Sequence, residues 1–230
     1  MTTDWITLQR YARIAGVAML LSIIFGTLGE AVLPARIIVM GDANATAANL
    51  LANPGLVRVS FATYLVEGIC DLALAGLFYI LLKPVDRNLA LLSAFFGIGS
   101  MVLFAVAQAS FYSATLAVGE SAGMAAFSPD QRNAIAMLAV RISYTIAGLF
   151  LILYGIATML RGYLIARSGY LPKLIGILFM IGGAGFALRT TTLLLAPAWS
   201  STLMLIPIAL GGIPLMLWLL IKGVRPPLRT

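Results

Sequence analysis

Two carboxylates inside an apolar segment are candidates for proton transfer or ligand binding. Glu67 and Asp71 lie four residues apart within a segment that is otherwise apolar from Val57 to Leu82. On a helix this spacing places both side chains on one face. The segment is long enough to span a bilayer, where a charged side chain near the centre costs about 2.5–3.5 kcal/mol on insertion scales. The pair therefore predicts compensating groups on other helices and marks a candidate binding or proton site.

The composition defines the class of protein. Of 230 residues, 61% are hydrophobic and 10% are charged, whereas a soluble domain carries about 25% charged residues. The apolar runs are continuous rather than alternating, which indicates helices and not the strands of a barrel. We therefore expect an all-α integral membrane protein, with residues 1–230 forming a single transmembrane helical domain.

Six apolar segments predict a bundle of six transmembrane helices. Their expected ranges are about 14–33, 57–82, 89–118, 129–160, 174–196 and 201–221. In the first outer loop, Asp42 is typical of a helix start and Asn53-Pro54-Gly55 of a helix end, so we expect a short surface helix over about 43–52.

The fourth predicted span has a recognisable start. Ser128 is followed by Pro129 and, three residues after the serine, by Gln131. Serine at the cap, proline at the first helical position and glutamine at the third are typical of a helix N-terminus with a capping box.

Basic residues predict the orientation. Ten of them fall on one side of the predicted spans, namely Arg10, Arg13, Lys83, Arg87, Arg161, Arg167, Lys173, Lys222, Arg225 and Arg229. Three fall near the other side, namely Arg36, Arg58 and Arg132. By the positive-inside rule both termini are cytoplasmic. The same rule explains the net charge of +7 without a nucleic-acid partner.

The intramembrane polar residues gather at one depth. At 1.5 Å of rise per residue, six of them fall in the outer half or near the midplane, on five predicted helices: Glu30, Glu67, Asp71, Gln108, Arg141 and Arg189. The simplest arrangement has both arginines facing the acids across the bundle interior. Neutral partners would be Gln108, Tyr64, Tyr112 and Tyr144. Because two cations face three carboxylates, one carboxylate would remain to bind a proton or a cationic ligand.

Enzyme signatures are weak. The chain has one cysteine, Cys70, and no histidine. Histidine is the commonest general base and metal ligand in proteins. Lysines occur only at the ends of the spans, which disfavours a serine–lysine pair. Three carboxylates could bind a hard cation, but the nearby arginines disfavour it. We expect no catalytic residue, no metal and no cofactor.

Two functional hypotheses remain. The first is a small transporter or binding protein for a hydrophobic or amphipathic molecule or for protons, with Glu67 or Asp71 as the titrating group. The second is a non-enzymatic structural or accessory membrane subunit, because buried acid–arginine pairs can simply hold helices together. An intramembrane enzyme acting on lipid is the least favoured. A homo-oligomer or a protein partner is compatible with both hypotheses, and membrane lipids are partners in each.

Three short motifs occur together with Glu67. They are Arg13-Ile-Ala-Gly16, Leu171-Pro172-Lys-Leu-Ile-Gly176 and Leu217-Trp218-Leu-Leu-Ile-Lys222-Gly223. In this order and spacing the chain resembles the bacterial membrane proteins of domain-of-unknown-function family 4386. The resemblance covers nearly the whole chain. It implies a six-helix, multi-pass protein of the cytoplasmic (inner) membrane and implies no established activity.

Overall fold

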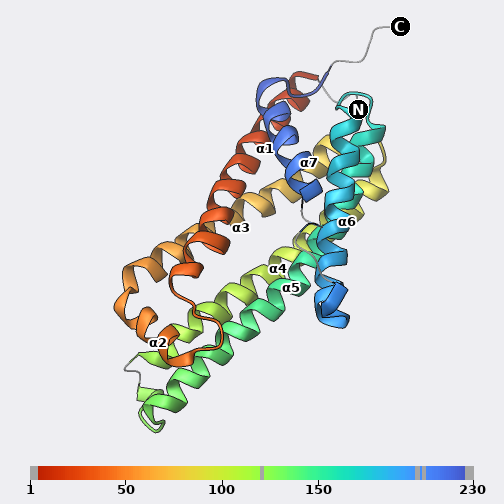
Figure 1. Ribbon diagram of the computed structural model, residues 1–230. Helices are drawn as coiled ribbons and strands as arrows, with labels where there is room; N and C mark the ends of the chain where they lie inside the picture. The colour runs from red at the N-terminus through yellow and green to blue at the C-terminus, as the bar shows by residue number, and fades with distance from the viewer. Residues whose placement is uncertain (1–4, 120–121, 200–202, 204–205, 226–230) are drawn as a thin grey trace, which may run out of the picture. The chain divides into compact units, whose positions relative to one another are not determined.

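The computed structural model describes residues 5–119, 122–199, 203 and 206–225. Within these residues all regular structure is helical (Figure 1). The α-helices are α1 (Trp5–Gly26), α2 (Ala43–Ala52), α3 (Pro54–Leu82), α4 (Arg87–Val118), α5 (Pro129–Arg167), α6 (Lys173–Leu195) and α7 (Ile206–Ile221). Shorter elements are the π-helix η1 (Thr27–Val32) and the 3-10 helices η2 (Pro34–Arg36), η3 (Ala122–Met124) and η4 (Pro197–Trp199).

Five helical segments of the described chain are long and apolar enough to cross a membrane. They are Trp5–Arg36, Pro54–Leu82, Arg87–Val118, Pro129–Arg167 and Lys173–Leu193. Length and composition therefore indicate a multi-pass membrane protein. Helix α7 has 16 described residues, and part of the predicted sixth span, residues 201–202 and 204–205, lies outside the described residues. The sixth crossing and the orientation stay predictions.

Two helix boundaries differ from those expected. Helix α1 already begins at Trp5 instead of near residue 14, and α5 continues to Arg167 instead of ending near Leu160. The extension of α5 has a physical reason, because Leu164 and Ile165 are completely buried beyond the expected end. Arg161 consequently lies inside α5 rather than beyond its end.

Polar caps set several helix starts. At α5 the predicted capping box is confirmed: Gln131 N–H donates to Ser128 Oγ at 3.3 Å, and Ser128 N–H donates to Gln131 Oε1 at 2.9 Å. At α4, Asp86 Oδ1 accepts from the N–H groups of Asn88 and Leu89 at 2.9 and 3.0 Å. This cap explains why α4 begins at Arg87.

Helix α2 has the range predicted for the short helix of the first loop. Asp42 caps it, accepting from Ala45 N–H at 2.9 Å. Inside it, the fully buried Thr46 exchanges two hydrogen bonds with the Val39 backbone, at 3.0 and 3.1 Å. One face of α2 is therefore packed against its own preceding loop. Its position at a membrane surface stays a prediction.

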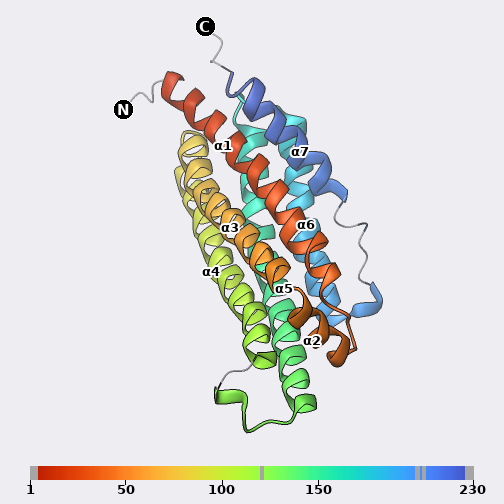
Figure 2. The same ribbon diagram turned by 90° about the vertical axis from the view of Figure 1, so that its left-hand side faces the viewer.

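The chain divides into two compact units. The first contains Met1–Leu20, Cys70–Met101 and Leu149–Thr230, and the second contains Leu21–Ile69 and Val102–Gly148. In the first unit α7 runs beside α6 (Figure 2). There Gln9 of α1 holds the end of α7, since its Nε2 donates to Lys222 O at 2.9 Å and its Oε1 accepts from Val224 N–H at 2.8 Å.

The second unit is centred on an aromatic group. Tyr64 of α3 lies edge-on to Phe104 and Phe111 of α4, with ring centroids 6.0 and 6.3 Å apart. At one end of this unit Asn133 Nδ2 donates to Asn44 Oδ1 at 2.9 Å, which links α5 to α2. The ring contacts of Tyr64 thus hold together α3, which carries Glu67, and α4, which carries Gln108.

Candidate functional site

The first predicted span changes its helical geometry at Glu30. Residues Thr27–Val32 form a π-helix, and Leu33 N–H donates to the carbonyl of Leu28, five residues earlier, at 2.9 Å. Single π-turns within α-helices are rare and occur frequently at functional sites. Glu30 directly follows Gly29, the buried residue of this π-helix.

Two glycines let this segment approach α3 closely. A Cβ atom at Gly26 would lie 2.5 Å from Glu67 Oε1, and one at Gly29 would lie 2.7 Å from Thr63 Oγ1. Both distances are below van der Waals contact, so any larger residue would displace its neighbour. The glycines therefore make the space in which the Glu67 carboxylate sits.

Acidic and phenolic groups meet at Tyr64. This tyrosine is 7% exposed and Glu67, one turn further along α3, is also 7% exposed. Glu30, Glu67 and Tyr144 all lie close enough to the Tyr64 hydroxyl to interact with it electrostatically. Four of the predicted site residues therefore come together in the second unit.

Gln108 adds a buried amide to this unit. Its side chain is 9% exposed, and its Oε1 has no hydrogen-bond partner within the described part of the chain. Leaving a buried polar atom without a partner costs about 1–3 kcal/mol. Such an atom is a natural acceptor for a bound ligand.

A cavity of about 210 Å³ lies in the same unit, between the end of α2, the start of α3 and the end of α4. Its lining is Leu50, Leu51, Pro54, Val57, Arg58, Tyr112, Thr115 and Val118. Most of these side chains are apolar, and the ring of Tyr112 also packs on Phe61 with centroids 5.1 Å apart. Because Tyr112 and Gln108 are four residues apart on α4, the cavity lies one helical turn from the buried amide.

Four of the predicted site residues have exposed side chains. The expected interior position of Arg141 is not what the structure shows, because its side chain is exposed. Glu30 is exposed as well, and Tyr112 and Tyr144 are 38% and 47% exposed. An arginine side chain is long enough to carry its charged head away from an apolar interior, so helix spacing alone does not fix where that head lies.

Asp71 and Arg189 belong to the first unit. Asp71 is 7% exposed and Arg189 is half-buried. A single cavity that gathers them with Glu67 stays a prediction.

The sequence interpretation missed Arg161. This residue is 2% exposed, its Cζ lies 5.3 Å from the centre of the Phe78 ring, and its Nη2 packs against Gly97 so closely that a Cβ there would clash. Asp71 and Tyr154 lie within electrostatic reach of its guanidinium. Asp71 and Phe78 are seven residues apart on α3, so they share the face that meets Arg161. The available signal was the apolar stretch after Arg161, which places the residue within a hydrophobic run.

The chain is similar in sequence to known proteins. One relative, an uncharacterized protein of Archaeoglobus fulgidus, is 30% identical over 118 residues, which are 51% of this chain and 57% of the relative. The chain thus spans little more than half the length of that relative. No solved structure matches the chain. The family described as Domain of unknown function (DUF4386) matches residues 14–223, and the chain belongs to this family.

Proposed function

We propose that the protein is a small transporter or binding protein for a hydrophobic or amphipathic molecule, with its site in the second unit. The buried Gln108 amide carries the proposal. Its Oε1 has no partner among the described residues, and it lies one helical turn from a cavity lined by both apolar and polar side chains. A polar acceptor and apolar walls in one place suit an amphipathic ligand.

The chemistry of the site suggests the ligand class. The carboxylate of Glu67 and the carbonyl oxygen of Gln108 both accept hydrogen bonds. They would bind a ligand that donates N–H or O–H groups, such as an alkyl amine or alcohol. The cavity of about 210 Å³ is below the range of about 300–1,000 Å³ that is usual for drug-sized ligands. The ligand is accordingly small, or only one end of it enters.

Glu67 is the proposed titrating group. Its side chain is buried beside Gly26. Both Glu67 and Glu30 lie close enough to Tyr64 to interact with it electrostatically. Ionisable side chains at membrane depth are commonly part of proton or ion pathways. Binding coupled to protonation of Glu67 would require no catalytic residue, metal or cofactor. The protein would act as a multi-pass component of the cytoplasmic membrane.

The surroundings of Arg161 favour a second candidate, a structural or accessory subunit. That buried cation is held by Phe78 and by close packing on Gly97. Buried charge with this kind of packing can serve to fix which helices meet. A purely structural role predicts that ligand binding is absent, whatever residue occupies position 67.

A cavity-filling pair of variants tests the proposal. The probe is a fluorescent alkylammonium dye, and binding is measured by fluorescence with the protein in nanodiscs. Leu51 lines the cavity and is 58% exposed, whereas Leu138 lies outside its lining and is 56% exposed. We expect Leu51→Trp to weaken dye binding and Leu138→Trp to leave it unchanged. Equal binding by both variants and the wild type would contradict the proposed site.

A further inference from the structure

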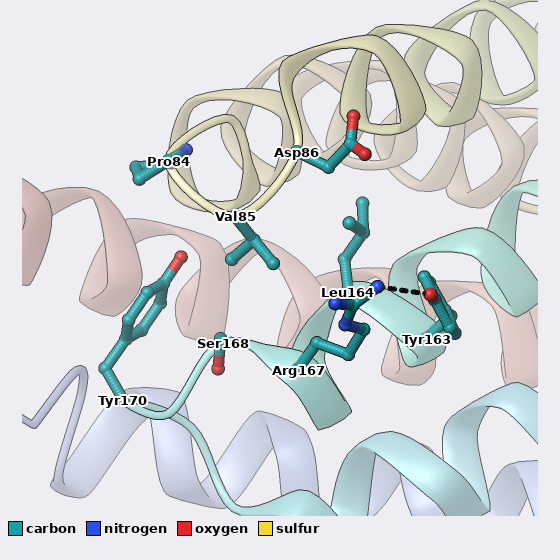
Figure 3. A pocket seen from close by; sticks show the side chains of 8 residues that line it. All are labelled: Pro84, Val85, Asp86, Tyr163, Leu164, Arg167, Ser168 and Tyr170. Atoms are coloured by element: carbon teal, nitrogen blue, oxygen red, sulfur yellow. Dashed lines mark hydrogen bonds between the residues drawn. The ribbon is translucent and has the colours of Figure 1, made fainter.

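A second cavity, of about 350 Å³, lies in the first unit (Figure 3). There the turn between α3 and α4 faces the end of α5. The lining consists of Pro84, Val85, Asp86, Tyr163, Leu164, Arg167, Ser168 and Tyr170. None of these residues belongs to the proposed site in the second unit.

Two of the polar side chains act as fixed walls. The Tyr170 hydroxyl donates to the carbonyl of Leu81 at 2.5 Å. The Ser168 hydroxyl donates to Ile165 O at 2.8 Å and accepts from Leu171 N–H at 3.1 Å. Because these hydrogen bonds occupy both hydroxyl groups, they shape the cavity rather than offer donors to a ligand.

Arg167 is the cation of the cavity and is already oriented. Its Nη1 donates to the Tyr163 hydroxyl oxygen at 2.6 Å, and its Cζ lies 5.5 Å from the centre of the Tyr163 ring (Figure 3). A guanidinium has five N–H donors, so most of them remain for another acceptor. The Tyr163 hydroxyl accepts from Arg167 and keeps its own proton for donation.

The one carboxylate of the lining has another role. Asp86 caps α4 through the N–H groups of Asn88 and Leu89. Within the described residues it makes no ion pair with Arg167, whose side-chain hydrogen bond goes to Tyr163. The negative charge of Asp86 is therefore compensated at a helix N-terminus, and Arg167 is left without a carboxylate partner among the described residues.

The cavity lies where candidate spans end. Helix α3 ends at Leu82, α4 begins at Arg87 and α5 ends at Arg167. One further exposed cation, Lys83, directly precedes the lined turn. Basic pockets between transmembrane helices at the level of the head groups bind the phosphates of anionic lipids, and arginine matches phosphate geometry with paired N–H donors.

We propose that this cavity binds the phosphate group of an anionic phospholipid, with the Arg167 guanidinium and the Tyr163 hydroxyl as donors. The acyl chains extend along the exposed apolar surface of the neighbouring spans. The lipid site is independent of the proposed function, because it lies in the first unit and uses other residues.

Native mass spectrometry of protein released from nanodiscs tests this proposal. One set of nanodiscs contains phosphatidylglycerol and the other only phosphatidylcholine. We expect the wild type to retain one phosphatidylglycerol and no phosphatidylcholine. Because a charge-assisted hydrogen bond is lost, Arg167→Gln should lower the affinity for that lipid about tenfold. Arg87→Gln, with the same change of charge at an exposed position outside the lining, should retain lipid like the wild type.

Tyr163→Phe supplies a second variant that keeps the aromatic ring. Its retention of phosphatidylglycerol should fall below that of the wild type, because the hydroxyl donor is gone. Equal loss in Arg167→Gln and Arg87→Gln would overturn the site, since the effect would then be one of general surface charge. Addition of inorganic phosphate separates the sources of the anion. Complete displacement of the lipid by dilute phosphate, with a bound phosphate mass in its place, would overturn the assignment to a lipid.

Discussion

Gly26 of the first span lies against the carboxylate of Glu67 on α3, at a distance that no larger residue would allow. A Cβ atom at position 26 would stand 2.5 Å from Oε1 and 2.9 Å from Cδ of Glu67. The contact joins the residue that we propose to titrate to the start of the π-helix that carries Glu30. It makes the position of Glu67 sensitive to changes in the first span.

Replacing Gly26 by alanine should alter the site more than the fold. The clashing atoms belong to the far end of a flexible side chain, so the carboxylate moves aside and the helices need not separate. Overpacking of about 1–3 kcal/mol is partly offset by the helix propensity of alanine, about 1 kcal/mol better than glycine. We expect a small change in thermal unfolding temperature and a clear loss of dye binding.

Gly76→Ala is the control for this substitution. Gly76 is also in a helix, and an added Cβ there meets nothing within 4 Å. That variant should keep both its stability and its dye binding. If Gly26→Ala lost stability heavily but bound the dye normally, the contact would be structural only.

Gln108→Leu should raise stability and lower binding. Because Oε1 is buried without a partner in the described structure, removing the amide relieves an unfavourable burial of about 1–3 kcal/mol. The same change deletes the proposed ligand acceptor. Thermal unfolding and dye binding measured on one preparation would show the two effects with opposite signs. A variant that loses both stability and binding would assign Gln108 to the core.

Arg161→Met should destabilise the first unit. Removing one member of a buried group of charges costs about 3–5 kcal/mol, because the remaining charge loses its compensation. Asp71 is the carboxylate within electrostatic reach of Arg161. The double variant Arg161→Met with Asp71→Asn should therefore recover much of the lost stability in chemical unfolding. Additive losses in the double variant would show that the two residues do not interact.

Ionisation of the Tyr170 hydroxyl should lower the stability of the protein in alkaline solution. This residue lies between α5 and α6, and burial raises the pKa of its hydroxyl above the ordinary value of 10.0. The neutral hydroxyl is therefore favoured by folding, so its contribution is complete below about pH 10 and declines as the pH rises toward the folded-state pKa. The unfolding temperature of Tyr170→Phe should depend less on pH above that value than that of the wild type. Parallel curves for both proteins would contradict the assignment.

Much of the helical framework follows from local sequence. Continuous apolar runs predict the helices, and polar caps predict several of their starts. The capping box of Ser128 and Gln131, and the short helix after Asp42, occur where expected. These features depend on residues within one or two turns, so a sequence pattern is sufficient to find them.

The partners of the buried charges could not be predicted in the same way. Spacing gives the face of a helix and the depth of a residue, but not which neighbouring helix supplies the opposite charge. Spacing predicts Arg161 just beyond the end of a span, yet it packs between Phe78 and Gly97. Spacing likewise predicts Arg141 in the interior, yet its side chain is exposed. No local sequence signal marks the π-helix at Glu30, within which Gly29 packs against Thr63 and Tyr64.

Native mass spectrometry of the wild type beside Glu67→Gln, both released gently from nanodiscs, would show whether a small molecule depends on the Glu67 carboxylate for binding. The substitution keeps the size of the side chain and removes its charge and its capacity to titrate. We expect a discrete bound small-molecule mass in the wild type that is lost in the variant, with the fold intact. Identical spectra, with only a lower unfolding temperature for Glu67→Gln, would contradict a binding function and favour the structural subunit.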